Sequence, residues 1–130
     1  MIYTYTAILT PSDDGSKYYA KVPDIAGCCT SGNSIPDAID MITDALCDCL
    51  IVLEDNNITP PQPSEQSSIQ HDPDSMLTII KADTISHRAQ TDTKCVRKNV
   101  SVPAWMVSLA DKRGINCSKV LQDALLHVLS

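Results

Sequence analysis

Hydrophobic and polar positions alternate in the first part of the chain, which is the pattern of half-buried strands. The segment "MIYTYTAIL" (1–9) alternates and is rich in β-branched and aromatic residues. The segment "KYYAKVPDI" (17–25) repeats the pattern after the turn cluster "TPSDDGS". We therefore predict a hairpin from these two segments and a third strand in the short stretch "GCCTSGN" (27–33).

The period changes to that of a helix at Ser34. Ser34 and Asp37 have the spacing of a capping box, and Pro36 suits the first turn. Apolar residues then recur every three or four positions over about five turns, as one helix face requires; they are Ile35, Ala38, Ile39, Ile42, Ala45, Leu46, Cys49, Leu50 and Leu53. The opposite face carries Asp37, Asp40, Asp44 and Asp48, which we interpret as solvated surface, with a binding face as the alternative.

A polar, proline-rich stretch separates this helix from a further strand. Residues 58–75 read as a loop, and "MLTIIKAD" (76–83) reads as a strand whose two successive isoleucines predict burial on both faces. Residues 1–83 are thus predicted to form an α+β unit, a small, mostly antiparallel sheet with one packed helix. The segment "TISHRAQTDTK" (84–94) has little apolar periodicity, and we predict a linker.

Residues 95–130 form a second pattern, of one strand and two helices. In "VRKNVSV" (96–102) alternation places Val96, Val100 and Val102 on one face, and Arg97, Asn99 and Ser101 on the other. Lys98 falls on the apolar face, which a flexible stem tolerates at a sheet edge. Pro103 opens a helix that Gly114 ends, and Asn116 can cap the next one.

This second unit is too small to stand alone. Units below about 40 residues rarely bury a sufficient core, and a lone strand leaves its backbone unpaired. Both problems are solved if two copies pair their strands antiparallel. The ribbon then presents Arg97, Asn99 and Ser101 twice, and such a ribbon fits the major groove of DNA, where Arg reads guanine and Asn reads adenine. Candidate phosphate contacts lie at the start of the second helix, at Asn116, Ser118 and Lys119, although helix capping alone also explains Asn116.

Charge divides the chain in the same way. Residues 1–93 hold 4 Lys/Arg and 14 Asp/Glu, a net charge of −10, whereas residues 94–130 hold 6 and 2, a net charge of +4. The two values account for the net charge of −6 of the whole chain. A basic end can meet nucleic acid, and an acidic body can meet a basic protein.

Several classes of protein do not match the sequence. The N-terminal segment lacks a basic region and a cleavage site, and no apolar run reaches 18 residues, so we expect a cytoplasmic protein with reduced cysteines. The cysteine pairs at 28–29 and 47–49 suit neither a disulfide nor a zinc site. Asp13 and Asp14 lie in a predicted turn, and no carboxylates are placed to converge. We therefore expect no enzyme, no metal and no cofactor.

Two stretches together resemble a known family. "VRKNVSVPAWMVSLADKRGINCSKVLQDAL" resembles the ribbon-helix-helix domain of bacterial repressors, and specifically the C-terminal domain of HicB-type antitoxins. "VPDIAGCCTSGNSIPDAI" is similar to the "PD-x-x-G-C" element of the HicB N-terminal domain. The two occur in the family's order and cover nearly the whole chain. The least typical features are Lys98 on the nominal core face and the long proline-rich loop at 59–75.

The resemblance implies a fold and a function. The N-terminal domain (1–83) is expected to be partial RNase H-like and to neutralise HicA, a small RNA-cleaving toxin. The ribbon-helix-helix domain (95–130) is expected to dimerise and to repress its own operon by binding operator DNA, with Arg97, Asn99 and Ser101 matching the groove-facing positions. Assembly beyond the dimer is left open. The alternative is a free-standing ribbon-helix-helix repressor whose acidic domain senses a ligand or forms oligomers.

Overall fold

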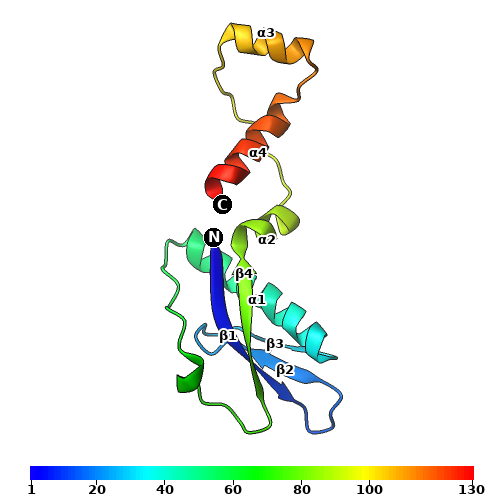
Figure 1. Ribbon diagram of the computed structural model, residues 1–130, viewed down its shortest axis with the longest axis vertical. Helices are drawn as coiled ribbons and strands as arrows, with labels where there is room; N and C mark the ends of the chain where they lie inside the picture. The colour runs from blue at the N-terminus through cyan, green and yellow to red at the C-terminus, as the bar shows by residue number, and fades with distance from the viewer.

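A four-stranded antiparallel sheet, crossed on one face by a long helix, forms the first part of the computed structural model, which describes residues 1–130 (Figure 1). The sheet has the order β3-β2-β1-β4, and every neighbouring pair is antiparallel. Its strands are β1 (Ile2–Pro11), β2 (Tyr18–Lys21), β3 (Cys29–Gly32) and β4 (Met76–Asp83). The predicted β-β-β-α-β order and the α+β class are confirmed.

Helix α1 (Ile35–Asp55) buries its predicted apolar face against the sheet. Ser34 caps it, because the Asp37 amide donates to Ser34 Oγ at 3.2 Å. The Asp37 carboxylate accepts from the amide of Asn33 at 2.8 Å, so it caps one residue earlier than a standard capping box. The fully covered helix residues include Ile42, Leu46 and Leu50. The core therefore lies between α1 and one face of the sheet.

The other face of the sheet has no helix. Ile80 points toward α1 and is 3% exposed, whereas its neighbour Ile79 points away and is 61% exposed. The prediction that both isoleucines of β4 are buried is therefore wrong for Ile79. Successive strand residues face opposite sides, so one covering helix can bury only one of two neighbours.

Residues expected to form a linker continue instead as helix α2 (Thr84–Thr91). The Asp83 carboxylate caps this helix by accepting from the Ser86 amide at 3.2 Å. His87 Nε2 lies 2.8 Å from Asp48 Oδ1, and Arg88 Nη2 lies 2.8 Å from Asp55 Oδ1, so α2 docks on α1. The linker prediction is wrong for 84–91, because polar contacts rather than an apolar stripe hold the helix.

Residues 92–103 have no regular structure and lead to helices α3 (Ala104–Lys112) and α4 (Cys117–Leu129). Gly114 adopts φ 65° between them, as predicted for a residue that ends α3. Figure 1 shows this pair standing away from the sheet, beyond α2. The loop between α1 and β4 contains one 3-10 turn, η1 (Gln66–Ser68), and is tied to Asp24 by Ser64, whose hydroxyl donates to that carboxylate at 2.6 Å.

Candidate functional site

The predicted base-reading residues lie in residues 92–103, the connector between α2 and α3. Arg97, Asn99 and Ser101 are exposed, and their backbone has no ladder partner within the single chain. Val96 is 83% exposed and Val100 55% exposed, so the apolar side of the segment is uncovered as well. The strand was predicted only for a pair of chains, and it stays a prediction.

The two C-terminal helices also lack a core. Trp105, the only tryptophan, is 62% exposed, and no side chain from 95 to 130 is buried. The exposed apolar residues of α3 and α4 include Met106, Val107, Leu109, Val120, Leu121, Leu125, Leu126, Val128 and Leu129. So many exposed large apolar side chains on two short helices are typical of an association surface. The arrangement thus agrees with a unit that is completed by another chain.

The start of α4 brings the predicted phosphate contacts together. Asn116 caps the helix, because its Oδ1 accepts from the Lys119 amide at 3.2 Å. The amides of Cys117 and Ser118 make no hydrogen bond within the chain. Lys119 Nζ lies 3.5 Å from Asp123 Oδ1, an exposed pair that leaves the ammonium in reach of solvent. Free amides and a lysine at a helix N-terminus can bind an anion, while the capping role of Asn116 is the part that the geometry shows.

The acidic face of α1 is only partly free. Asp48 pairs with His87, and Asp55 pairs with Arg88. Asp40 and Asp44 are exposed and have neither a hydrogen bond nor an ion pair within the chain. The outer side of α1 therefore presents unpaired negative charge.

A polar cluster that the sequence pattern did not reveal joins β1, α1 and α2. Glu54 accepts hydrogen bonds from the Tyr3 hydroxyl at 2.8 Å, from Thr84 Oγ1 at 3.0 Å and from Arg88 Nη2 at 3.2 Å. Burial and the hydrogen bond to Glu54 raise the pKa of Tyr3 to about 12. Burial alone would raise the pKa of Glu54, but the three hydrogen bonds outweigh it and lower that pKa.

The cluster is structural in character, since it is fully paired. Thr84 is completely covered, and its hydroxyl oxygen also lies 3.1 Å from the Met1 carbonyl oxygen, so the single hydroxyl hydrogen can serve either acceptor. One sequence signal could have pointed to α2, namely Asp83 followed three residues later by Ser86 at a helix start. The cluster itself joins residues as far apart as Met1 and Thr84, a distance over which no local pattern acts.

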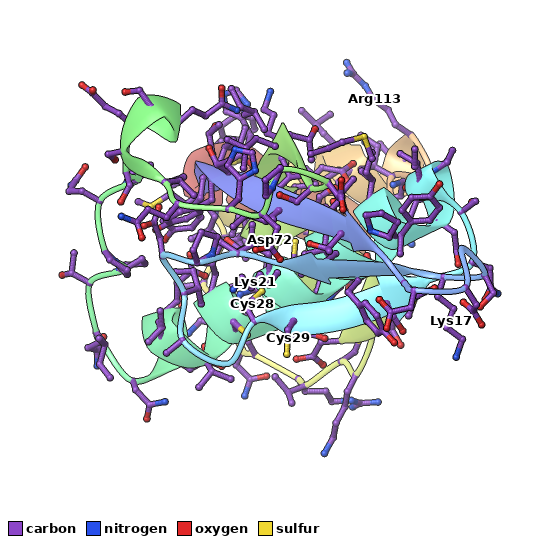
Figure 2. The ribbon with its side chains drawn as sticks, turned by 90° about the horizontal axis from the view of Figure 1, so that it is seen from below. Lys17, Lys21, Cys28, Cys29, Asp72 and Arg113 are labelled. Atoms are coloured by element: carbon purple, nitrogen blue, oxygen red, sulfur yellow. The ribbon has the colours of Figure 1, made fainter.

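The remaining candidate features are metal-binding groups, cysteine thiols and membrane-spanning helices. No group of three His, Cys, Asp or Glu side chains is arranged to hold a metal ion. Figure 2 shows Lys17 and Arg113 extending outward on different parts of the molecule. Burial and the neighbouring Cys49 raise the pKa of the Cys28 thiol to about 12, which keeps it protonated, whereas Cys29 is exposed. None of the helices combines the length and the apolar character that crossing a membrane requires.

Comparison with known proteins gives one family and several solved structures. A family model described as a HicB-like antitoxin of bacterial toxin-antitoxin systems matches residues 5–124. A toxin-antitoxin complex from Streptococcus pneumoniae contains a chain that is 25% identical, with a TM-score of 0.62 over 96% of this chain and 97% of that one. The antitoxin HicB of Burkholderia pseudomallei is also 25% identical, with a TM-score of 0.54 over 98% and 99% of the two chains.

A third structure, a HicA3 and HicB3 toxin-antitoxin complex, is 20% identical with a TM-score of 0.50 over 62% of this chain and 99% of that one. At that identity it supports the fold alone. No curated protein sequence matches the chain.

Proposed function

The chain belongs to the HicB-like antitoxin family, and from this premise we propose that it neutralises a small, basic, RNA-cleaving toxin through its N-terminal domain and represses its own operon through its C-terminal domain. The first of these domains comprises β1–β4 together with α1 and α2. The second is expected to comprise residues 95–130, that is, the predicted strand segment before α3 together with α3 and α4.

Charge supports the toxin-binding half of this proposal. The acidic part of the chain has a net charge of −10 over residues 1–93, and Asp40 and Asp44 on α1 are exposed and unpaired. An RNA-cleaving toxin needs positive charge to hold its substrate. Complementary charge speeds association and orients the partners, so this surface suits such a toxin. The 25% identical chain from Streptococcus pneumoniae is likewise part of a toxin-antitoxin complex.

The observation that carries the DNA-binding half is the uncovered apolar surface of the basic C-terminal unit. Val96, Val100 and Trp105 are all exposed, and no residue of this unit is buried within the single chain. Pairing of two copies through the connector segment would bury these side chains and would turn Arg97, Asn99 and Ser101 to one polar face. Such a ribbon is a known means of reading base edges in the major groove.

Substitutions separate base reading from charge. Arg97→Ala and Asn99→Ala should each weaken operator binding and relax discrimination, since one good bidentate contact supplies roughly 1–3 kcal/mol of discrimination. Arg97→Lys is the matched control, because it keeps the charge and loses the fork that matches guanine. Lys119→Ala should instead weaken all DNA about equally and flatten the salt dependence.

The measurement is fluorescence anisotropy with operator and scrambled DNA at two salt concentrations. If Arg97→Ala weakens both DNAs equally, or if Arg97→Lys keeps full discrimination, this segment does not read bases. None of the substitutions should change suppression of the toxin. A full-length chain that binds operator but neither binds nor suppresses the toxin would instead support a free-standing repressor.

A further inference from the structure

Two cysteines from separate elements meet in the core of the N-terminal domain. Cys28 lies directly before β3 and is 3% exposed, and Cys49 lies on α1 and packs half-buried against the same core. Their thiols lie within hydrogen-bonding reach of each other. In the sequence Cys28 stands beside Cys29, and Cys49 stands close to Cys47, but the fold brings together one member of each of these pairs.

A closed turn holds Cys28 in this position. The Ile25 amide donates to the Val22 carbonyl oxygen at 3.1 Å, and the Cys28 amide donates to the Ile25 carbonyl oxygen at 3.3 Å. The Val22 amide donates to the Cys28 carbonyl oxygen at 3.0 Å and closes the turn. Gly27, at φ 77°, permits the reversal of the chain just before Cys28. Because a helix holds Cys49 and this turn holds Cys28, the backbone itself keeps the two thiols together.

A hollow of about 450 Å³ on the surface reaches only one of the two cysteines. Cys49 lines it, whereas Cys28 does not. The other lining residues come from the turn, from α1 and from the loop after α1; they are Asp24, Ile25, Ala26, Val52, Leu53 and Pro61. A small molecule that enters the hollow therefore meets Cys49 first and finds the Cys28 thiol next to it.

We propose that Cys28 and Cys49 form an oxidation-sensitive thiol pair, which a hydroperoxide converts to a disulfide within one chain. The Cys49 sulfur attacks one peroxide oxygen and the O–O bond breaks; the departing oxygen takes the thiol proton and leaves as water, so that Cys49 becomes a sulfenic acid. The Cys28 sulfur then attacks the Cys49 sulfur and the S–O bond breaks; the hydroxide takes the Cys28 proton and leaves as a second water. The two thiols lose two electrons in total, and hydrogen peroxide gains both.

The environment of Cys28 suits the second of these steps and not the first. Burial and the contact with Cys49 raise the pKa of the Cys28 thiol to about 12. A protonated, covered thiol reacts poorly with an oxidant from solution, but it can attack a sulfenic acid that forms in contact with it. Cys28 is thus the resolving cysteine, and Cys49 is the cysteine that the oxidant meets.

The disulfide would tie the middle of α1 to the turn before β3. The closed loop runs from 28 to 49 and contains β3 and the first part of α1. Closing a loop of this kind restricts the unfolded chain, so the oxidised domain should be more stable than the reduced one. In reducing compartments, disulfides of this type are usually transient and report on oxidants. The inference does not depend on toxin binding or on DNA binding.

Peptide mapping of the oxidised full chain tests the pairing. The three exposed cysteines are first replaced by serine; they are Cys29, Cys95 and Cys117. The folded protein is treated with a small excess of hydrogen peroxide, its free thiols are blocked, and it is cleaved before each aspartate. This cleavage places Cys28, Cys47 and Cys49 on three different peptides, which are 24–36, 44–47 and 48–54. Mass spectrometry should find peptide 24–36 joined to peptide 48–54.

Cys47 is the internal control, because it is buried on the same helix only two residues from Cys49. In urea, where the fold is absent, the nearest neighbours in sequence, Cys47 and Cys49, should link instead. The proposal would be overturned if the folded chain links Cys47 as readily as Cys28, if it links only to other chains, or if Cys49 gains oxygen without forming a link.

Thermal unfolding gives a second measurement. The melting temperature Tm of the oxidised chain should rise by roughly 10 °C and return to its first value after dithiothreitol. Cys49→Ser is the matched control, since serine is close to cysteine in size and cannot form the link, and its Tm should not respond to peroxide. A link that forms without a rise in Tm, or an equal rise in Cys49→Ser, would overturn the stabilising role of this pair.

Discussion

Replacing Gly32 by alanine should destabilise the N-terminal domain severely, because β3 and α1 meet there without room for a side chain. A Cβ atom at Gly32 would lie 2.6 Å from the Ala38 Cα and 2.8 Å from the Asp37 carbonyl carbon, and closer still to the Ala38 amide nitrogen. All three contacts are to backbone, so no rotamer change relieves them. Ordinary contact begins at 3.4 Å, and the shortest contact, to the Ala38 amide nitrogen, would require the start of α1 to move away by about 1 Å.

The cost can be placed within the range for overpacking. Forcing extra atoms into a packed core costs typically 1–3 kcal/mol, and contacts to the backbone of a helix put Gly32→Ala at about 3 kcal/mol. For a domain of this size that corresponds to a fall of about 12–24 °C in Tm. The retreat of α1 would also loosen the packing of Ile42, which is fully covered by the sheet.

Gly15→Ala is the matched control. Gly15 adopts φ 73° in the hairpin turn, but a Cβ there would meet nothing within 4 Å. The control therefore pays only for the left-handed backbone, about 1 kcal/mol. Urea unfolding followed by circular dichroism measures both variants, and toxin suppression should fall with Gly32→Ala only. If Gly32→Ala costs no more than Gly15→Ala, the close packing of β3 on α1 is wrong.

Two further predictions concern pH and the connector. The pKa of Glu54 is lowered from its ordinary value of 4.5 in the folded chain. The ionised carboxylate therefore stabilises the fold above that value, and this contribution is lost as pH falls through the lower, folded-state pKa. Unfolding free energies of wild type and Glu54→Gln, measured from pH 7 to pH 3, should converge in the acid range, and a difference that stays constant with pH would contradict this. Limited proteolysis followed by mass spectrometry should find early cuts in the loop at 59–75 and in residues 92–103, where the chain has no regular structure and no buried residue. Early cuts within α2 would show that its contacts with α1 do not hold.

The sequence was informative wherever an apolar period marked an element. The alternation in β1 and the three-and-four spacing in α1 were sufficient to predict the sheet and its covering helix, and the capping residues Ser34 and Asn116 were identified correctly. Helix α2 was missed because ion pairs of His87 and Arg88 dock it on α1. Such polar contacts produce no periodic pattern of apolar residues in the sequence. The exposure of Ile79 was missed because composition does not say how many faces of a sheet are covered.

The candidate site depends on relations between chains, which a single sequence records only indirectly. Alternation around Asn99 predicts a two-faced strand, yet the strand requires a partner to form. The ladder of β1 with β2 is shorter than that with β4 because β2 ends at Lys21. Beyond it the Ile25 amide donates to the Val22 carbonyl oxygen in a turn that leads to β3, and no local pattern in the sequence predicts where such a ladder stops.

Because β1 pairs with β4, the sheet can be completed only after β4 has been synthesised. Ile2 pairs with Asp83, so the first strand to leave the ribosome waits for the last strand of its sheet. At 5–20 residues per second, the interval of 81 residues takes about 4–16 s. During that time the nascent chain holds α1 without a finished sheet to cover, and both sides of the first half of β1 are open. A message that is cut or stalled before the codon for Asp83 therefore cannot yield the complete sheet, and the supply of this domain depends on intact messages.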